Sequence, residues 1–180
     1  MSTPKTIADL PEPKEHAVTE SEYFQDNYPD ETSHCYGCGR LNTEGLHVRS
    51  RWDGEESVAV HHTDPKYVAI PGFVYGGLVA YLIDCHGTGT ASAAAYRAAG
   101  RPLGSEPPLR FVTASLHVDY QRPTPMGVPL ELRGVLTEVK ERKVVVDITL
   151  SADGQQCASG TVVAVLAPDS MFAGSTDTAQ

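Results

Sequence analysis

The sequence lacks the features that mark membrane, secreted and nucleic-acid-binding proteins. It contains no stretch approaching the roughly 20 consecutive apolar residues that a membrane helix requires. Its N-terminal residues, MSTPKTIADLPEPKE, contain no apolar core of the kind found in signal peptides. Basic runs are absent as well, and 14 lysines and arginines against 23 acidic residues give a formal net charge of -9. These absences argue against a nucleic-acid-binding surface and predict a cytoplasmic protein with no membrane partner.

Cysteine is scarce, with four residues in 180. A chain of this size with 41% hydrophobic residues can bury a core without disulfides, so reduced thiols are expected. Cys35 and Cys38 have the Cys-x-x-Cys spacing that forms half of many zinc sites. No second such pair follows, and Cys85 and Cys157 are isolated in the sequence. We therefore expect no metal and no other cofactor, interpret Cys35 and Cys38 as part of a tight turn that docks the N-terminal arm, and interpret Cys85 as a core residue.

Composition divides the chain into three parts. Residues 1–31 are rich in proline and acidic residues, which predicts an extended, largely disordered arm with a short helix near residues 19–27. Residues 32–167 carry the hydrophobic patterns of one folded domain. Residues 168–180 return to small polar residues and predict a disordered tail.

The central part predicts one long helix and six strands. Residues 74–99 are small or apolar on nearly all faces, as in a buried helix, and Gly100 and Pro102 would end it. Residues 46–60 alternate across a turn and predict a first hairpin. Four further runs predict the remaining strands: 111–121, 128–141, 143–151 and 156–166. We expect an α+β domain in which an antiparallel sheet covers one helix. A single helix cannot cover both faces of that sheet, so a homodimer is expected.

Two local patterns lead to further expectations. Strict alternation in residues 111–121 predicts that Thr113 and Ser115 share one face of their strand. Within the helix, His86 points about 200° away from Asp84 and is expected to line a pocket or the dimer seam. The small residues 87–90 are expected to allow close helix packing across the dimer.

Three segments carry a family resemblance: HCYGCGRLNTEGLHV (34–48), PGFVYGGLVAYLIDCHGTGTAS (71–92) and VTASLHVDYQRPTPMG (112–127). Together they resemble, in the same order, the signature blocks of PaaI-like hotdog-fold acyl-CoA thioesterases. The resemblance implies the hotdog fold, in which a curved antiparallel β-sheet wraps a long central helix. It also implies dimerisation edge to edge, with acyl-CoA sites at the dimer interface; pairing of two dimers into a tetramer stays open.

The resemblance also implies an activity and its residues. By position, Asp84 matches the catalytic carboxylate, Thr113 the residue that orients water, and Gly76 the backbone amide that polarises the thioester carbonyl. A carboxylate in a partly desolvated cleft can act as general base or as nucleophile. Unpaired amides at a helix start can stabilise an oxyanion. The implied reaction is hydrolysis of an acyl-CoA to a carboxylic acid and a free thiol, without a metal.

Four further residues are candidates for substrate binding. Tyr75 stands where the family has histidine before the two glycines, and a phenol cannot be a cation at neutral pH. Tyr75 and Gly77 are expected to shape the pocket, and Ser115 could substitute for or assist Thr113. Arg122 is a candidate contact for coenzyme A phosphates, although it equally fits a solvated turn. Tyr75 leaves a second interpretation open, a non-hydrolytic hotdog protein that binds an acyl-thioester or a small apolar ligand. A hotdog hydratase is less favoured, because the helix lacks the Asp-x4-His dyad of those enzymes.

Overall fold

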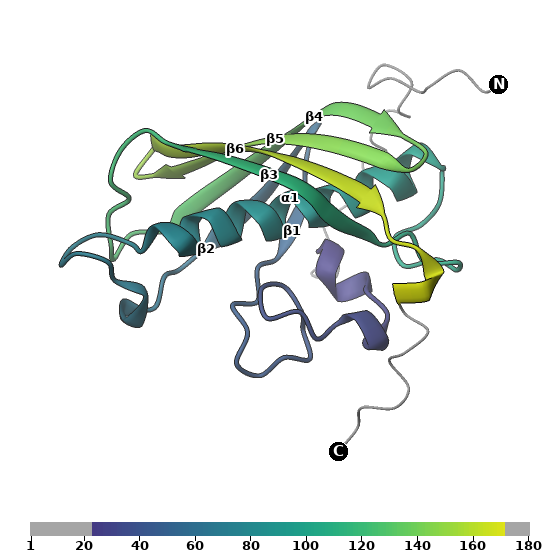
Figure 1. The fold of residues 1–180 in the computed structure, drawn as a ribbon, viewed down its shortest axis with the longest axis horizontal. Helices are drawn as coiled ribbons and strands as arrows, with labels where there is room; N and C mark the ends of the chain where they lie inside the picture. The colour runs from purple at the N-terminus through teal and green to yellow at the C-terminus, as the bar shows by residue number, and fades with distance from the viewer. Residues whose placement is uncertain (1–22, 172–180) are drawn as a thin grey trace.

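A computed structural model describes residues 23–171, which form one long helix, six strands and four short 3-10 helices (Figure 1). No helix in this part of the chain is long and apolar enough to cross a bilayer. The elements in chain order are η2 (Phe24–Asn27), η3 (Asp30–Thr32), β1 (Ser50–Asp53), β2 (Glu56–His61), η4 (Pro65–Tyr67), α1 (Gly76–Ala98), β3 (Phe111–Tyr120), β4 (Leu130–Lys140), β5 (Lys143–Ala152), β6 (Gln155–Leu166) and η5 (Asp169–Met171).

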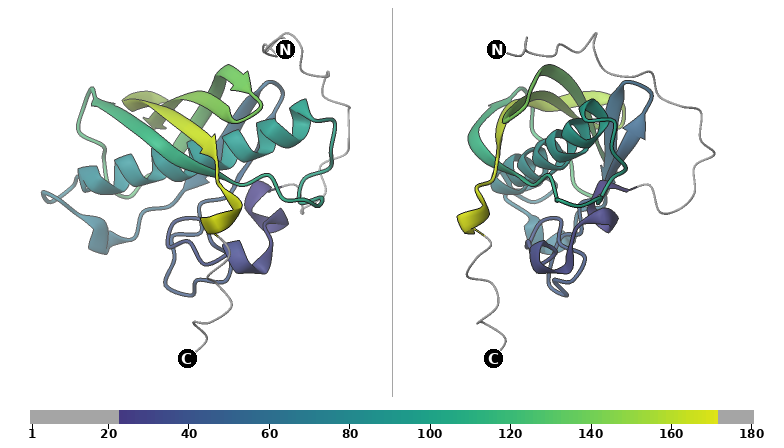
Figure 2. Two further views of the ribbon diagram at one scale, coloured as in Figure 1. Left: turned by 45° about the vertical axis from the view of Figure 1, so that its right-hand side comes forward. Right: turned by 90° about the vertical axis from the view of Figure 1, so that its right-hand side faces the viewer.

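The six strands form one antiparallel sheet in the order β1-β2-β4-β5-β6-β3. The sheet curves over α1, which lies along its concave face (Figures 1 and 2). Within the sheet β1 and β3 are the edge strands, each with a single neighbour. This arrangement confirms the α+β class and the hotdog architecture expected for the chain.

The element boundaries lie close to those predicted. The helix was expected over residues 74–99 and runs from Gly76 to Ala98, with Gly100 in the left-handed conformation just beyond it (φ 64°). The four later strands end within two residues of their expected limits. The first hairpin is confirmed, but β1 begins only at Ser50. The alternating residues 46–49 were expected to belong to this strand and lie outside it.

Residues 23–31, which were expected to belong to the extended arm, pack against the domain through Phe24 and Gln25. Phe24 is 1% exposed, and its ring lies 5.1 Å from that of Trp52. The side chain of Gln25 is equally buried: its amide donates to Ser50 Oγ at 3.3 Å and its carbonyl accepts from Ser50 N at 2.7 Å. The folded unit therefore includes the end of the presumed arm. The expectations for residues 1–22 and 172–180 lie outside the described residues.

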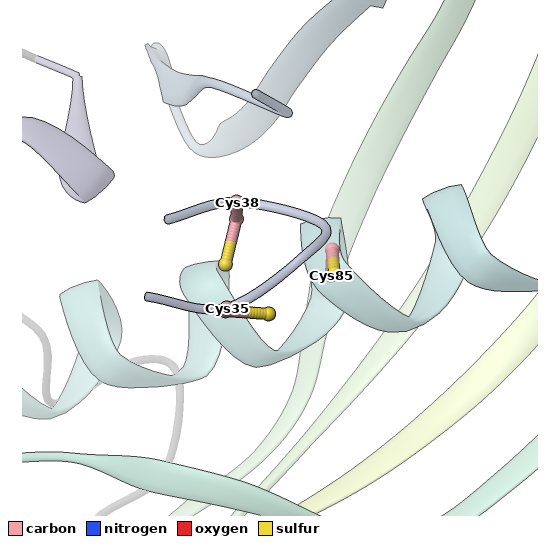
Figure 3. Close-up of side chains that lie close together, drawn as sticks. All are labelled: Cys35, Cys38 and Cys85. Atoms are coloured by element: carbon pink, nitrogen blue, oxygen red, sulfur yellow. The ribbon is translucent and has the colours of Figure 1, made fainter. Parts of the chain in front are cut away.

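The Cys35–Cys38 segment forms a tight turn that docks on α1 beside Cys85 (Figure 3). Gly39 N donates to Cys35 O at 2.8 Å and closes the turn. A Cβ at Gly37 would lie 2.2 Å from Cys85 Sγ, so no larger residue fits between the turn and the helix. The expectation that this turn docks the N-terminal segment is confirmed.

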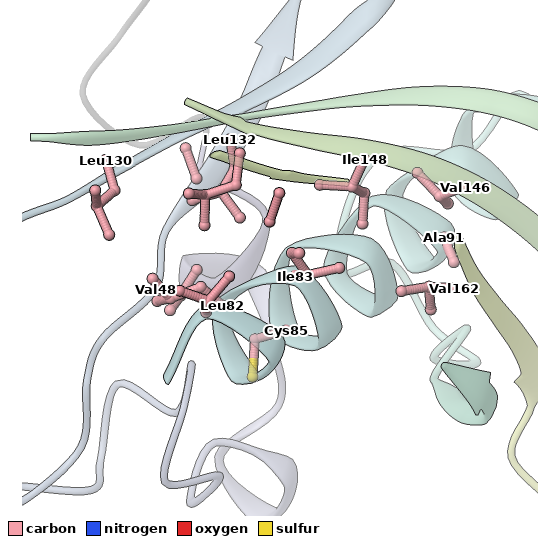
Figure 4. Packing of buried hydrophobic residues seen from close by; sticks show 14 of the residues in the cluster. Val48, Leu82, Ile83, Cys85, Ala91, Leu130, Leu132, Val146, Ile148 and Val162 are labelled. Atoms are coloured by element: carbon pink, nitrogen blue, oxygen red, sulfur yellow. The ribbon is translucent and has the colours of Figure 1, made fainter. Parts of the chain in front are cut away.

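The hydrophobic core lies between α1 and the concave face of the sheet (Figure 4). Leu82 and Ile83 of the helix are fully buried there. A Cβ at Gly87 would lie 2.6 Å from Val162 Cγ2, and a Cβ at Gly89 would lie 2.6 Å from the Gln25 amide. These glycines therefore bring the helix close to its own sheet and N-terminal segment, and their expected role in packing across a dimer is wrong.

His86 is a buried polar residue inside this core. It is 0% exposed, and its Nδ1 and Nε2 atoms lie 2.9 Å from Ser50 Oγ and 3.1 Å from Ser57 Oγ. Thr90 Oγ1 lies 2.7 Å from Ser57 Oγ and extends the network. Desolvation by burial lowers the pKa of His86 to about 4, so the ring is neutral. His86 therefore joins the helix to the β1–β2 hairpin, and its expected place in a pocket or dimer seam is wrong.

Candidate active site

Asp84 and Thr113 meet between the middle of α1 and the start of β3. Thr113 Oγ1 donates to Asp84 Oδ1 at 2.5 Å. Thr88, one helical turn after Asp84, lies 2.8 Å from Thr113 Oγ1 and donates to Asp84 O at 2.9 Å. Helix and strand thus hold one carboxylate oxygen in place. Thr88 was not singled out from the sequence, although its spacing of four residues from Asp84 puts it on the same helical face.

A β-bulge in β3 turns Thr113 toward the helix. Thr113 pairs with Ala164 of β6, whereas Ser115 pairs with the next residue back along β6, Val163, so Ala114 is the extra residue of the bulge. Directly opposed residues of an antiparallel pair lie on the same face, and neighbours on β6 point to opposite faces. Thr113 therefore shares the helix-facing side with the buried Ala164, and Ser115 points the other way. The expectation that Thr113 and Ser115 share a face is wrong.

The Asp84 carboxyl is half-buried, and its surroundings favour the neutral form. Desolvation raises the pKa of Asp84 above its ordinary value, and a negative charge at Cys35 raises it further. The hydrogen bond from Thr113 acts in the opposite direction and lowers the pKa. Within residues 23–171 no hydrogen bond engages the second carboxylate oxygen, Oδ2. Asp84 therefore combines a fixed oxygen with a free one, the arrangement that a general base or nucleophile needs.

The N-terminus of α1 presents amide groups beside an open pocket. In the described part of the chain the amides of Gly76 and Gly77 donate to no acceptor, as is usual at a helix start. Tyr120 donates its hydroxyl to Gly76 O at 2.8 Å. The pocket beside them has a volume of about 330 Å³, and its lining consists of Val74, Gly76, Val79, Tyr120, Gln121, Arg122, Pro123 and Thr124. Gly76 thus lies where a bound carbonyl oxygen could reach a free amide.

Tyr75 folds back over the start of the helix. A Cβ at Gly77 would lie 2.0 Å from the Tyr75 hydroxyl, so the phenol ring lies directly against this glycine. The ring is 52% exposed, and its hydroxyl donates to no partner in residues 23–171. Tyr75 therefore brings one free donor to the helix start, where the family has histidine.

Arg122 lies at the rim of the same pocket. Its side chain is exposed and donates to Gln155 Oε1 at 2.5 Å. It brings a positive charge to the pocket in a chain of net charge -9. This position fits a contact to an anionic group at the pocket mouth.

The two halves of the candidate site are far apart within one chain. Gly76 and Asp84 are eight residues apart on the same helix, which corresponds to about 12 Å along its axis. A thioester carbonyl bound at the Gly76 amide is therefore beyond the reach of the same chain's Asp84.

Three cysteines meet where the Cys35–Cys38 turn contacts α1. Cys85 is buried, as expected for a core residue, but the Sγ atoms of Cys35, Cys38 and Cys85 all lie within 4.8 Å of one another, so a cysteine that is isolated in the sequence has two close neighbours in the fold. Hydrogen bonds from the other two thiols hold the pKa of Cys35 well below its usual range. The hydrogen bond to Cys35 raises the pKa of Cys38 to about 12, and that of Cys85 above its usual range. In residues 23–171 this is the group of side chains that could hold a metal ion.

Comparisons with known proteins give the family. The sequence pattern of the thioesterase superfamily matches residues 71–159, and no curated protein matches the chain. A thioesterase superfamily protein from Shewanella loihica PV-4 is 50% identical, with 78% of this chain and 100% of that chain covered and a TM-score of 0.60.

Two more distant structures share the fold. PaaI from the phenylacetic acid degradation operon of E. coli is 14% identical, with 68% and 81% of the two chains covered and a TM-score of 0.55. A Streptococcus mutans UA159 protein bound to acetyl-CoA is 16% identical, with 67% and 88% covered and a TM-score of 0.52. Because the chain is 50% identical to the Shewanella protein along that protein's full length, it belongs to the thioesterase superfamily, whose hotdog fold it has.

Proposed function

We propose that the protein is a homodimeric acyl-CoA thioesterase that converts an acyl-CoA and water into a carboxylic acid and coenzyme A. Membership of the thioesterase superfamily supports thioester hydrolysis. The acetyl-CoA bound by the Streptococcus mutans relative supports coenzyme A as the carrier. The observation that carries the proposal is the Asp84–Thr113 pair, a carboxylate with one oxygen held by a threonine and the other free.

Asp84 acts on the acyl carbon in this proposal. Its free Oδ2 has two possible roles: it removes a proton from the attacking water, or it attacks the carbonyl carbon itself. The attack breaks the C–S bond, releases the coenzyme A thiolate and forms a mixed anhydride that water then hydrolyses. Thr113 fixes the direction of the carboxylate and thereby the position of the attacking water. Half-burial of Asp84 strengthens its basicity, because desolvation destabilises the charged form.

The start of α1 stabilises the charge that develops on the carbonyl oxygen. The Gly76 amide donates to the oxyanion, and the helix dipole adds a favourable field. Gly77 leaves room for the Tyr75 ring against the helix start, and the free hydroxyl of Tyr75 supplies a further donor. Arg122 contacts a phosphate of coenzyme A at the pocket rim. Ser115 has no part in this arrangement, since it points away from Asp84.

Two chains are needed to complete each site. The separation of about 12 Å between Gly76 and Asp84 prevents them from acting on one carbonyl within a chain. The edge strand β3 carries Thr113, is exposed along most of its length, and has a neighbour only on its β6 side. An antiparallel pairing of two such edges extends the sheet and covers the strand. It brings Asp84 and Thr113 of one chain toward the Gly76 of the partner subunit.

The first test is thiol release from short, medium, long and aromatic acyl-CoAs. Asp84→Asn keeps the size of the side chain and an acceptor for Thr113 but loses the base, so we expect kcat to fall about 100- to 10,000-fold. Glu55→Gln makes the same change from carboxylate to amide in the exposed β1–β2 turn, at the opposite edge of the sheet from β3, and is the matched control expected to keep full activity. Unchanged turnover by Asp84→Asn contradicts the proposed role.

The composite site has its own test, which uses two variants at Gly76. Gly76→Pro removes the amide hydrogen at the first helical position, which proline tolerates, and is expected to lower kcat about 100- to 1,000-fold. Gly76→Ala keeps the amide, and its Cβ would meet nothing closer than Tyr120 at 3.6 Å, so it serves as the control.

Mixing two inactive variants distinguishes a site that is shared between two chains from a site within one chain. If Gly76→Pro and Asp84→Asn chains exchange at random, half of the dimers are mixed and each holds one intact site. We expect recovery of about a quarter of the wild-type activity, because a two-fold dimer holds two equivalent sites. A mixture that stays inactive although native mass measurements show mixed dimers contradicts a site shared between chains.

A non-hydrolytic binding protein is the second candidate function. The observation that favours it is the Tyr75 ring, which covers part of the helix start at Gly77 and restricts approach to the amides. Calorimetric binding of acyl-CoAs by the wild type, with no thiol release on any member of the panel, would establish this alternative in place of hydrolysis.

A further inference from the structure

The three cysteines on the face of α1 that carries Cys85 form a site that the proposed function does not use. We propose that Cys35, Cys38 and Cys85 bind one zinc ion, which clamps the N-terminal segment to the central helix. Figure 3 shows the three side chains, two from the turn and one from the helix, entering the same space. The cluster would bind its ion whether or not the protein hydrolyses thioesters.

The spacing of the sulfur atoms fits a zinc ion. The three Sγ atoms lie within 4.8 Å of one another, so an ion between them lies at most about 2.8 Å from each, against a zinc–sulfur bond of about 2.3 Å. In a tetrahedral site two thiolates are about 3.8 Å apart. A small closing movement of the turn onto the helix therefore completes three zinc–sulfur bonds.

The turn holds Cys35 at an exposed position, which core packing of a small hydrophobic residue does not explain. The Gly39 amide closes the turn by donating to Cys35 O at 2.8 Å. The closed turn places the Cys35 sulfur beside those of Cys38 and Cys85.

Two glycines keep the turn pressed against the helix. At Gly37 a Cβ would lie 2.2 Å from Cys85 Sγ, and at Gly39 a Cβ would lie 2.5 Å from both Cys35 N and Ser33 O. A larger residue at Gly37 would push the turn away from Cys85, and one at Gly39 would open the turn itself. The two glycines thus maintain the approach that brings three sulfurs together.

The chemistry of the donor set selects zinc over hard cations. Thiolates are soft ligands that favour zinc over magnesium or calcium. Binding displaces the protons of those cysteines that are still thiols, which pass to solvent, and three thiolates with one Zn²⁺ form a complex of net charge −1. The exposed side of Cys35 leaves the fourth position to a water molecule.

The expected consequence is structural. A zinc ion at this site ties residues 35–38 to α1 at Cys85, one residue after Asp84. Both the turn and the buried part of the N-terminal segment are then held against the helix by metal bonds as well as by packing.

The test is metal analysis of the full chain, purified without a histidine tag and under reducing conditions. We expect about one equivalent of zinc per chain in the wild type. Cys35→Ser, at the exposed position, is expected to lose the ion. Cys157→Ser is the matched control, because this buried thiol lies outside the cluster, and is expected to keep it. Titration of the apoprotein with Co²⁺ gives thiolate-to-cobalt absorption in the wild type and Cys157→Ser, and none in Cys35→Ser.

Stability gives an independent readout, because an ion bound only by the native state stabilises it. A chelator is expected to lower the melting temperature of the wild type and Cys157→Ser, and to leave that of Cys35→Ser unchanged. Three results would overturn the proposal. One is a reduced wild type that neither contains zinc nor gives the cobalt absorption. Another is a Cys35→Ser variant that retains zinc at the wild-type level. The third is a disulfide between two of the three cysteines in the protein as purified from the cytoplasm.

Discussion

Acidification should destabilise this fold through His86, a histidine that is neutral because it is completely buried. Its two ring nitrogens face Ser50 and Ser57, with no carboxylate among its hydrogen-bond partners in residues 23–171. Protonation would place an unpaired positive charge inside the core, where charges are strongly disfavoured. The unfolded chain, in contrast, takes up the proton freely.

The size of the effect follows from the pKa. Burial lowers the pKa of His86 from 6.5 to about 4. The native state therefore binds fewer protons than the unfolded state below pH 6.5, so the free energy of unfolding falls as the pH falls. At 1.36 kcal/mol per unit, the loss is about 3 kcal/mol between pH 7 and pH 4 and is nearly complete at pH 4. That is a large part of the 5–15 kcal/mol typical of a domain.

The assay is urea unfolding at fixed protein concentration from pH 7.5 to pH 4. Excess chelator is present throughout, so that proton competition at the cysteines does not contribute. His86→Gln has no group that titrates in this range and should lose the part of the pH dependence that belongs to His86. His34→Gln is the matched control, because His34 is exposed and lies away from His61, a second histidine whose pKa is lowered by burial and by His62. It should follow the wild type at every pH.

The comparison between variants decides the prediction. Carboxylates titrate in all three proteins, so only the difference between the His86→Gln curve and the other two reports on His86. If the three curves remain parallel from pH 7.5 to pH 4, burial does not keep His86 neutral and the argument fails. A wild type that becomes more stable on acidification would contradict it even more directly.

Two further predictions concern the site and the N-terminal segment. Thr113→Val removes the hydroxyl that donates to Asp84 at 2.5 Å, and is expected to lower kcat/KM for acyl-CoA about 10- to 100-fold. Thr113→Ser should keep most of the activity, and equal rates for the two variants would refute the role of the hydroxyl. Phe24→Ala empties a 1% exposed position and is expected to lower the free energy of unfolding by about 3–5 kcal/mol. Leu41→Ala, at a 41% exposed position, should change the urea midpoint little.

Much of the fold could be predicted because its signals are local. The helix shows apolar residues on nearly all faces and a glycine stop, and the later strands alternate between turns. The packing of the N-terminal segment was harder to predict. Composition describes the whole segment and does not identify the few residues that pack against the domain. Phe24 and Gln25 are two buried residues in a polar, proline-rich region, and their burial depends on Trp52 and Ser50, which come much later in the chain.

The candidate site depends more on contacts between distant segments. The roles of Asp84 and Gly76 could be predicted from the family resemblance, because both residues belong to one sequence motif and lie on one helix. Ser115 was misplaced because a bulge inserts one residue without a sequence signal and reverses the facing of every residue before it. Without the bulge, Thr113 would point away from Asp84. The pair that carries the proposed chemistry therefore exists because of an irregularity that periodicity cannot reveal.

The cysteines show the same limit in another form. Metal sites are recognised in a sequence by pairs of ligands at short spacing, and among the cysteines only Cys35 and Cys38 form such a pair. The third sulfur lies 47 residues after Cys38, on a helix whose regular pattern gives it an ordinary core position. Gly37 is the residue that allows the approach, since a Cβ there would lie 2.2 Å from Cys85 Sγ. That contact joins segments far apart in the chain, so the spacing of the cysteines in the sequence cannot reveal it.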